Sequence, residues 1–310
     1  MTKTKLTANI LFSGIGCQEI GIMATGRHNL EVVATSEIDK EAVIAYAAIH
    51  NGLTPKMVKA YKRYPDTGSM VEELEAKHIG FNPKTKKEYN WRRQKRELVR
   101  KTWLAVKLSH NLGDIERIKK LPYADVWTVS FPCTDISRAG KREGFAQGSK
   151  TRSSLLWVQV KLLETSVKDN EAPVIIMFEN VKDLVQEEFR PGFDKLLSDL
   201  SSLGYNSYWK ILSAKDYGTP QSRERVFVYC IRKDADKGTY KFPEPVAFTR
   251  SLDDILLPGH TPGAPAGKPA ASITHNFPTS KKGITDINIY LPGTTDGCTS
   301  TIPAGLSPLC

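Results

Sequence analysis

The sequence predicts an α/β fold with a doubly wound, mostly parallel sheet, and three observations support this prediction. Strand-like apolar segments alternate with helical segments over about 230 residues. The run Ala172–Phe178 is continuously apolar, as expected for a strand that is buried on both faces. A glycine turn, Phe12–Gly16, follows the first strand and precedes a helix, which is the start of a nucleotide-binding βαβ unit.

The first strands carry the pattern of a nucleotide site. Residues 6–12 form a short apolar strand, 31–36 a second strand, and 40–50 an Ala- and Ile-rich helix. Glu37 follows the second strand, where a carboxylate is placed to bind both hydroxyls of a ribose. No basic residue adjoins the glycines, which argues against a triphosphate ligand.

Residues 52–109 are predicted to be a basic insertion in the sheet domain, helical near 70–77 and 93–108. Its loops are expected at Tyr64–Gly68 and Phe81–Lys84. Lys56 to Lys101 hold fourteen Lys or Arg and six Asp or Glu, out of a net charge of +10 for the chain. Aromatic residues are interleaved with these charges, namely Tyr61, Tyr64, Tyr89, Trp91 and Trp103. The segment is either a solvated helical face or a surface for nucleic acid.

Beyond the insertion, two polar residues each allow two interpretations. Asp114 either accepts a hydrogen bond from an adenine amino group or caps the turn 115–120. Cys133 follows Pro132, which ends the strand 126–129, and open α/β sheets bind ligands at such strand ends. A free cysteine is more often a small buried apolar residue, so Cys133 by itself does not distinguish a role at a ligand site from packing in the core.

The second half of the chain repeats the alternation. We expect a mobile basic loop at 137–144, helices at 153–165 and 193–203, and strands at 208–213 and 226–231. Glu179 places a carboxylate at the end of the strand 172–178, and Cys230 is expected to pack in the core. Pro, Gly, Thr and Ser dominate from 258 to 280, so a domain boundary is placed near residue 245.

The composition of the 310 residues is that of a globular protein without a membrane span. No apolar run approaches about 18 residues, and the N-terminus lacks a signal-peptide core. Five cysteines at irregular spacing, without a CxxC pair, support neither a zinc site nor a disulfide framework. We therefore predict a cytoplasmic protein and no metal site.

The order of the motifs resembles the DNA cytosine-5 methyltransferase family of bacteria and phages, over about residues 6–255. The matching motifs are Phe12-Ser-Gly-Ile-Gly16, Glu37-Ile-Asp39, Gly113-Asp114-Ile115, Phe131-Pro-Cys-Thr134, Phe178-Glu-Asn-Val181 and Gln221-Ser-Arg-Glu-Arg225. The resemblance implies a Rossmann-like methyltransferase sheet and S-adenosyl-L-methionine as the cofactor. It also implies transfer of a methyl group to carbon 5 of cytosine in double-stranded DNA, for restriction-modification or protection of phage DNA.

The resemblance also assigns roles to individual residues. Cys133 would be the nucleophile, Glu179 would hold the N3 edge of the cytosine, and Arg223 and Arg225 would support the base and the loop. The cofactor pocket would be lined by Phe12, Gly14, Gly16, Glu37, Ile38, Asp114, Ile115, Pro132 and Leu155. A carbon 5 inside the duplex stack requires that the base be flipped out.

The C-terminal part departs from the family pattern. Residues 1–245 would form the catalytic domain and 246–310 a partial or truncated target-recognition region, which lacks the late motifs of the family. Either the gene product is truncated, or a second polypeptide supplies the missing part. The alternatives are an RNA (tRNA) cytosine-5 methyltransferase, a catalytic-like subunit that needs a second polypeptide, a non-catalytic binding subunit that retains the fold, and a nicotinamide dehydrogenase. The dehydrogenase leaves the Pro-Cys, Glu-Asn-Val and Gln-x-Arg-x-Arg motifs unexplained.

Overall fold

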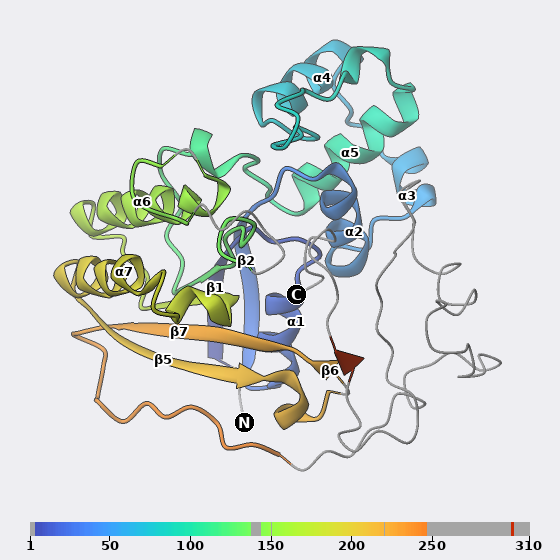
Figure 1. Cartoon of the computed structure of the whole chain (residues 1–310). Helices are drawn as coiled ribbons and strands as arrows, with labels where there is room; N and C mark the ends of the chain where they lie inside the picture. The colour runs from blue at the N-terminus through green and yellow to red at the C-terminus, as the bar shows by residue number, and fades with distance from the viewer. Residues whose placement is uncertain (1–3, 138–143, 150, 220, 247–298, 301–310) are drawn as a thin grey trace, which may run out of the picture.

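The computed structural model describes residues 4–137, 144–149, 151–219, 221–246 and 299–300, and its main feature is a six-stranded sheet. The strand order is β2-β1-β3-β4-β7-β5. The strands are β1 (Thr4–Leu11), β2 (His28–Ser36), β3 (Val126–Val129), β4 (Ile175–Val181), β5 (Tyr205–Ser213) and β7 (Glu224–Arg232). The first four pair in parallel, whereas β7 is antiparallel to both β4 and β5. The predicted mostly parallel sheet is confirmed (Figure 1).

Apolar side chains cover both faces of this sheet. Successive residues of β1 point to opposite faces, so Leu11 lies in the main core while Ile10 lies in a smaller cluster on the other side. The helices are α1 (Cys17–Ala24), α2 (Lys40–His50), α6 (Leu156–Lys168) and α7 (Arg190–Ser202). Single-turn helices η2 (Ile115–Arg117), η3 (Arg152–Leu155), η4 (Lys182–Val185) and η5 (Ala214–Tyr217) connect the elements. The apolar faces of α6 and α7 pack into the main core, which also contains Cys230 as predicted.

The insertion folds into a helical body with a core of its own. Its elements are α3 (Pro55–Ala60), α4 (Thr67–Ala76), η1 (Trp91–Arg93) and α5 (Arg96–Leu108), which Figure 1 shows beside α2. Trp91 and Trp103 are 1% and 5% exposed, and the three tyrosines pack against the same cluster. Val43 and Ala47 of α2 belong to this core too. The aromatic residues therefore stabilise the insertion and do not form an exposed stacking surface. For the lysines and arginines, the choice between a solvated face and a nucleic-acid surface stays a prediction.

Several element boundaries differ from the prediction. A loop was predicted at Tyr64–Gly68, and this prediction is wrong for Thr67 and Gly68, which belong to α4. Asp66 accepts a hydrogen bond from Ser69 N and thereby caps the helix, which starts at Thr67. Helix α3 was not predicted; Thr54 caps it and Pro55 occupies its first turn. Strand β5 begins at Tyr205, three residues earlier than expected.

Little of the C-terminal region belongs to the described residues. A two-residue strand β8 (Thr299–Ser300) pairs in parallel with β6 (Gln221–Ser222). The predicted target-recognition region and most of the loop 137–144 lie outside the described residues. Among the helices that the structure describes, none has the length and apolar character needed to cross a membrane.

Candidate active site and cofactor pocket

The motifs meet at one edge of the sheet because of its strand order. Strands β1, β3 and β4 are parallel neighbours, so the residues that follow or end them lie at the same edge. β1 leads into Phe12, β3 into Cys133, and Glu179 lies near the end of β4. β7 starts at this edge because it is antiparallel, and it thereby brings Arg225 opposite Val181. Residues that are far apart in the sequence thus form one candidate site.

Glu179 and Arg225 are joined directly. Arg225 Nε lies 3.2 Å from Glu179 Oε1, and both side chains are mostly buried, at 21% and 17% exposed. The two residues occupy diagonal positions on neighbouring strands, where side chains on the same face come together. Arg225 also donates from Nη1 to the carbonyl of Glu224, at 2.8 Å. The guanidinium is therefore fixed and holds the carboxylate in place.

Arg223 lies close enough to the Glu179–Arg225 pair to shift the pKa of Arg225, and one of its donor atoms has no hydrogen-bond partner among the described residues. Its Nη2 atom is buried and makes no hydrogen bond within the described part of the chain. A buried donor without a partner costs about 1–3 kcal/mol, so such atoms often face a ligand. Burial, and next the positive charge of Arg223, lower the pKa of Arg225. The Gln-x-Arg-x-Arg motif thus concentrates positive charge beside Cys133.

The thiol of Cys133 is half-buried, and its pKa is shifted by burial and by the charged residues around it. Burial raises this pKa most, Arg225 lowers it, Glu179 raises it, and Arg223 lowers it to a smaller extent. Arg225 acts in the direction expected of a cation that favours the thiolate. Burial nevertheless outweighs it, so the pKa of the thiol lies above its ordinary value.

Asn180 joins the two strand ends, a role that the sequence analysis did not assign. Its side chain is buried, donates from Nδ2 to the carbonyl of Phe131 at 2.9 Å, and accepts from Val181 N at 2.9 Å. The Phe131-Pro132-Cys133 segment is thereby tied to β4 beside Glu179. A polar residue between a site carboxylate and an apolar residue was the only signal in the sequence.

The glycine turn after β1 is shaped for close approach. Gly16 has a φ of 86°, and a Cβ there would lie 2.2 Å from His50 Nε2. Gly14, also at positive φ, donates its N–H to Glu37 Oε2 at 3.0 Å. Phe12 adopts a φ of 55°, which is uncommon for a residue with a side chain. At Gly16 the turn therefore has no room for a larger residue, whereas at Gly14 only the positive φ disfavours one.

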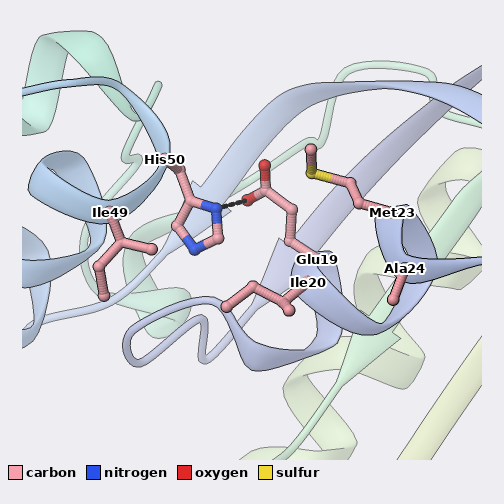
Figure 2. Close-up of a pocket in the computed structure, with 6 residues that line it drawn as sticks. All are labelled: Glu19, Ile20, Met23, Ala24, Ile49 and His50. Carbon is pink, nitrogen blue, oxygen red and sulfur yellow. Dashed lines mark ion pairs between the residues drawn. The ribbon is translucent and has the colours of Figure 1, made fainter. Parts of the chain in front are cut away.

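A buried polar network holds the turn from behind. His50 Nε2 contacts the carbonyl of Ile15 at 2.9 Å, and its Nδ1 lies 3.3 Å from Glu19 Oε2. Tyr46 donates its hydroxyl to the same oxygen of Glu19. Figure 2 shows Glu19 and His50 side by side as an ion pair. Both line an open pocket together with Ile20, Met23, Ala24 and Ile49. The pocket lies between α1 and α2, and these two helices together fix the backbone of Ile15.

Glu37 is placed as predicted, and most of its acceptor capacity is already used. Oε1 accepts from the N–H groups of Ile38 and Asp39, both at 2.8 Å, and Oε2 accepts from Gly14. Burial raises the pKa of this carboxyl, while the three N–H groups act in the opposite direction. A carboxylate has about four acceptor positions, so one remains on Oε2. One ribose hydroxyl fits this position, and a second would have to displace an N–H group.

The remaining predicted cofactor residues differ in their exposure. Asp114 caps η2 by accepting from Glu116 N at 3.0 Å, as one of the two interpretations required. Ile115 is 2% exposed and belongs to the main core, and Leu155 packs against that core. Ile38 and Pro132 are half-buried. Ile115 therefore belongs to the core and offers little surface to a ligand.

Fold and site together define an α/β protein in which a glycine turn and Glu37 lie at the same sheet edge as a thiol, a carboxylate and paired arginines. The family model of the C-5 cytosine-specific DNA methylases matches residues 66–276. The chain therefore belongs to this family, whose members use S-adenosylmethionine.

Individual relatives agree with this assignment. The type II methyltransferase M2.ScrFI of Lactococcus lactis subsp. cremoris is 39% identical over 249 residues, which are 79% of this chain and 66% of that protein. The orphan methyltransferase M.SssI of Spiroplasma monobiae is 33% identical over 72% of this chain and 58% of its own length. The chain thus spans less than two thirds of both. The crystal structure of the Dnmt2 methyltransferase of S. pombe is 17% identical, with a TM-score of 0.42, over 81% of this chain and 53% of that one.

Proposed function

We propose that this chain transfers a methyl group from S-adenosyl-L-methionine to carbon 5 of cytosine in double-stranded DNA, through a covalent adduct with Cys133. The observation that carries the proposal is the arrangement of Cys133 beside the Glu179–Arg225 pair, whose atoms lie 3.2 Å apart. Membership of the family supports the same reaction. A DNA substrate would place the protein in the cytoplasm, at the nucleoid.

The residues present suit this cofactor. Gly14 and Gly16 let the backbone approach a ligand, Glu37 keeps one acceptor position on Oε2, and Asp114 lies at the end of the same pocket. The cofactor would supply an electrophilic methyl group. Phe12, Ile38, Pro132 and Leu155 would enclose it with apolar surface, over the support of Ile115.

The chemistry of cytosine explains the need for a thiol. Carbon 5 is a poor nucleophile, and addition of the Cys133 thiolate to carbon 6 moves the electrons of the double bond to carbon 5. After methylation, loss of the carbon 5 proton lets the thiolate leave, so Cys133 is regenerated. Covalent catalysis thereby divides one difficult step into easier ones.

Glu179 and the arginines would stabilise the adduct. A carboxyl group at N3 counters the charge that develops on the base when the thiolate adds, which lowers the barrier rather than strengthening ground-state binding. Arg225 keeps Glu179 in position through its Nε atom. Arg223 would donate its unpaired Nη2 to the flipped nucleotide.

Trapping with a fluorinated base tests the proposal. Duplex DNA containing 5-fluorocytosine, together with S-adenosylmethionine, should give a covalent protein–DNA adduct, because fluorine cannot leave as the proton does. Cys133→Ser should abolish the adduct while cofactor binding persists. Cys230→Ala removes a thiol that is fully buried in the core, and it should keep the adduct. Loss of cofactor binding in a folded Cys133→Ser variant would contradict the assigned role.

The same assay separates the alternatives. An adduct with fluorinated RNA but not with DNA would favour the RNA enzyme, and no adduct with either would favour a non-catalytic subunit. The need for a second polypeptide stays a prediction. Repeating the trap with and without the product of a neighbouring gene would test it.

A further inference from the structure

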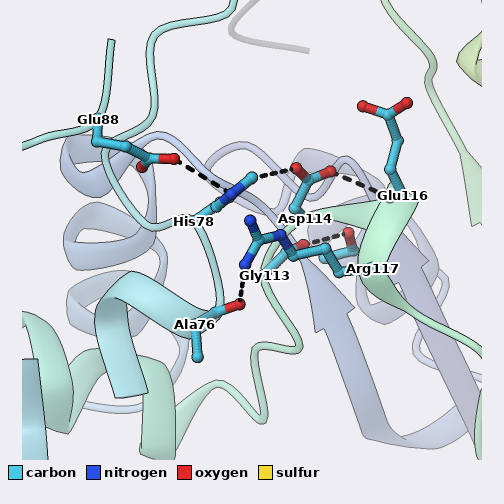
Figure 3. A network of polar contacts seen from close by, with 8 residues as sticks. Ala76, His78, Glu88, Gly113, Asp114, Glu116 and Arg117 are labelled. Carbon is cyan, nitrogen blue, oxygen red and sulfur yellow. Dashed lines mark hydrogen bonds and ion pairs between the residues drawn. The ribbon is translucent and has the colours of Figure 1, made fainter. Parts of the chain in front are cut away.

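The segment Ala76–Phe81 of the insertion lies directly on the loop that carries Asp114, and no function has yet been given to it. Lys77 O accepts from Asp114 N at 3.0 Å, and Lys77 Nζ donates to the carbonyl of Asn111 at 2.8 Å. Arg117 Nη1 donates to the carbonyl of Ala76 at 3.0 Å. Figure 3 shows the contact between Arg117 and Ala76, with Asp114 nearby.

The same segment also reaches the second cofactor motif. Gly80 donates its N–H to the carbonyl of Ile38, at 2.6 Å. Ile38 and Asp114 are two of the residues assigned to the cofactor, and the segment is bonded to the backbone of both. It therefore lies along the adenine end of the proposed pocket.

His78 contacts the Asp114 side chain itself. Its Nδ1 atom lies 2.7 Å from Asp114 Oδ2, while its Nε2 atom lies 3.2 Å from Glu88 Oε1 (Figure 3). The ring stacks on Phe81, with centroids 5.0 Å apart, and its side chain is 15% exposed. The backbone of His78 has a φ of 57°, a left-handed conformation that few residues other than glycine adopt. This backbone conformation directs the ring toward Asp114.

These contacts fix the orientation of the Asp114 carboxylate. Oδ1 accepts from Glu116 N at 3.0 Å and Oδ2 faces His78, so both oxygens are held. Each oxygen keeps one acceptor position, because a carboxylate has about four in all. A fixed carboxylate with free acceptor positions suits an exocyclic amino group and disfavours a carbonyl oxygen at the same place.

We propose that His78 is a positioning residue of the cofactor pocket, which holds Asp114 so that it selects the 6-amino group of adenine. Phe81 holds the ring of His78 by stacking. The inference rests on the proposed function, since it needs an S-adenosyl ligand in this pocket. It assigns to the insertion a role in cofactor selectivity that is independent of DNA.

Binding of two ligands to the whole chain tests this proposal. The first is S-adenosylhomocysteine, and the second is its analogue in which oxygen replaces the 6-amino group. Calorimetry gives the affinity of each, so the readout does not depend on methyl transfer. The wild-type chain should prefer the amino ligand, and His78→Gly should reduce that preference about tenfold, as expected for loss of one hydrogen bond to a charged group.

Two further variants keep the backbone conformation. His78→Asn retains a donor toward Asp114, and Asn tolerates positive φ, so it should restore most of the preference. His78→Asp has the same size as His78→Asn but opposes one carboxylate with another, and it should lose the preference. His110 is the matched control, because it is an exposed histidine with a φ of 49°; His110→Asn and His110→Gly should change neither affinity.

The outcomes separate the two proposals. If the wild-type chain binds neither ligand, the proposed cofactor is wrong. If it binds S-adenosylhomocysteine and the folded His78 variants keep the wild-type preference, the inference about His78 is overturned. Equal weakening of both ligands would also overturn it, because that result indicates a purely structural role.

Discussion

Asn180 gives the most direct test of how the active-site edge is built. The side chain is 3% exposed and bridges the Phe131 carbonyl to β4. Asn180→Ala would leave that buried carbonyl without its donor and Val181 N without its side-chain acceptor. An unsatisfied buried polar group costs about 1–3 kcal/mol, and the lost side-chain volume adds to it. We therefore expect a loss of about 3 kcal/mol in the free energy of unfolding.

Thermal unfolding measures this loss. For a domain of this size about 1 kcal/mol corresponds to 2–4 °C, so Tm should fall by roughly 6–12 °C. The control is Asn206→Ala, because Asn206 also donates a side-chain hydrogen bond, to Asp236 at 2.7 Å, but at an exposed position. That variant should change stability by less than about 0.5 kcal/mol.

A second readout connects the stability change to the site. The Asn180 bond holds the chain two residues before Cys133, so its loss should free the loop and raise the rate at which iodoacetamide alkylates Cys133. Asn180→Asp keeps the size but turns a carboxylate toward the Phe131 carbonyl, and it should be at least as unstable at pH 8. The reasoning is refuted if Asn180→Ala matches the wild type in both Tm and alkylation rate.

Two further predictions follow from the same edge of the sheet. Gly16→Ala should abolish cofactor binding and lower Tm, because the new Cβ would lie 2.2 Å from the His50 side chain. The control is Gly21→Ala inside α1, where a Cβ meets open space, and this change should stabilise the helix by about 0.5–1 kcal/mol. Equal effects of the two variants in calorimetry would contradict this prediction. The alkylation of Cys133 should rise with pH about a midpoint above that of an ordinary thiol, because burial raises its pKa. Glu179→Gln removes a charge that raises the pKa of Cys133 and should move the midpoint of alkylation down, while Arg225→Gln should move it up. Mass spectrometry measures the alkylation. Shifts in the opposite directions would refute the placement of these two charges beside Cys133.

The sheet and the position of Cys133 at a strand end were predictable because their signals are local. Pro132 ends a strand by its own geometry, and Cys133 follows it whatever the rest of the fold does. Glu179 follows an apolar run whose length alone indicates a buried strand. The strand order that brings them together is a tertiary property, yet parallel strands leave few arrangements, so the shared edge could be expected.

The insertion was less predictable for a physical reason. Its aromatic residues lie between lysines and arginines, and along the sequence this pattern resembles a nucleic-acid surface. In the fold, Trp91 donates to the carbonyl of Ile79 and Trp103 donates to Glu73, so both indoles face inward. These partners lie 12 and 30 residues away in the chain. Because burial depends on such distant partners, charge and aromatic content alone do not reveal it.

The loop that carries Asp114 shows how far the insertion is integrated into the sheet domain. Gly113 has a φ of 83°, and a Cβ there would lie 2.2 Å from Lys77 O. Gly113 is therefore required because the backbone of the insertion packs closely against this turn. This requirement is separate from any that cofactor binding imposes. A change in the core of the insertion that displaces Lys77 must also displace Asp114, since their backbones are hydrogen-bonded. Cofactor affinity should therefore respond to mutations in the insertion even where these touch neither the cofactor nor DNA.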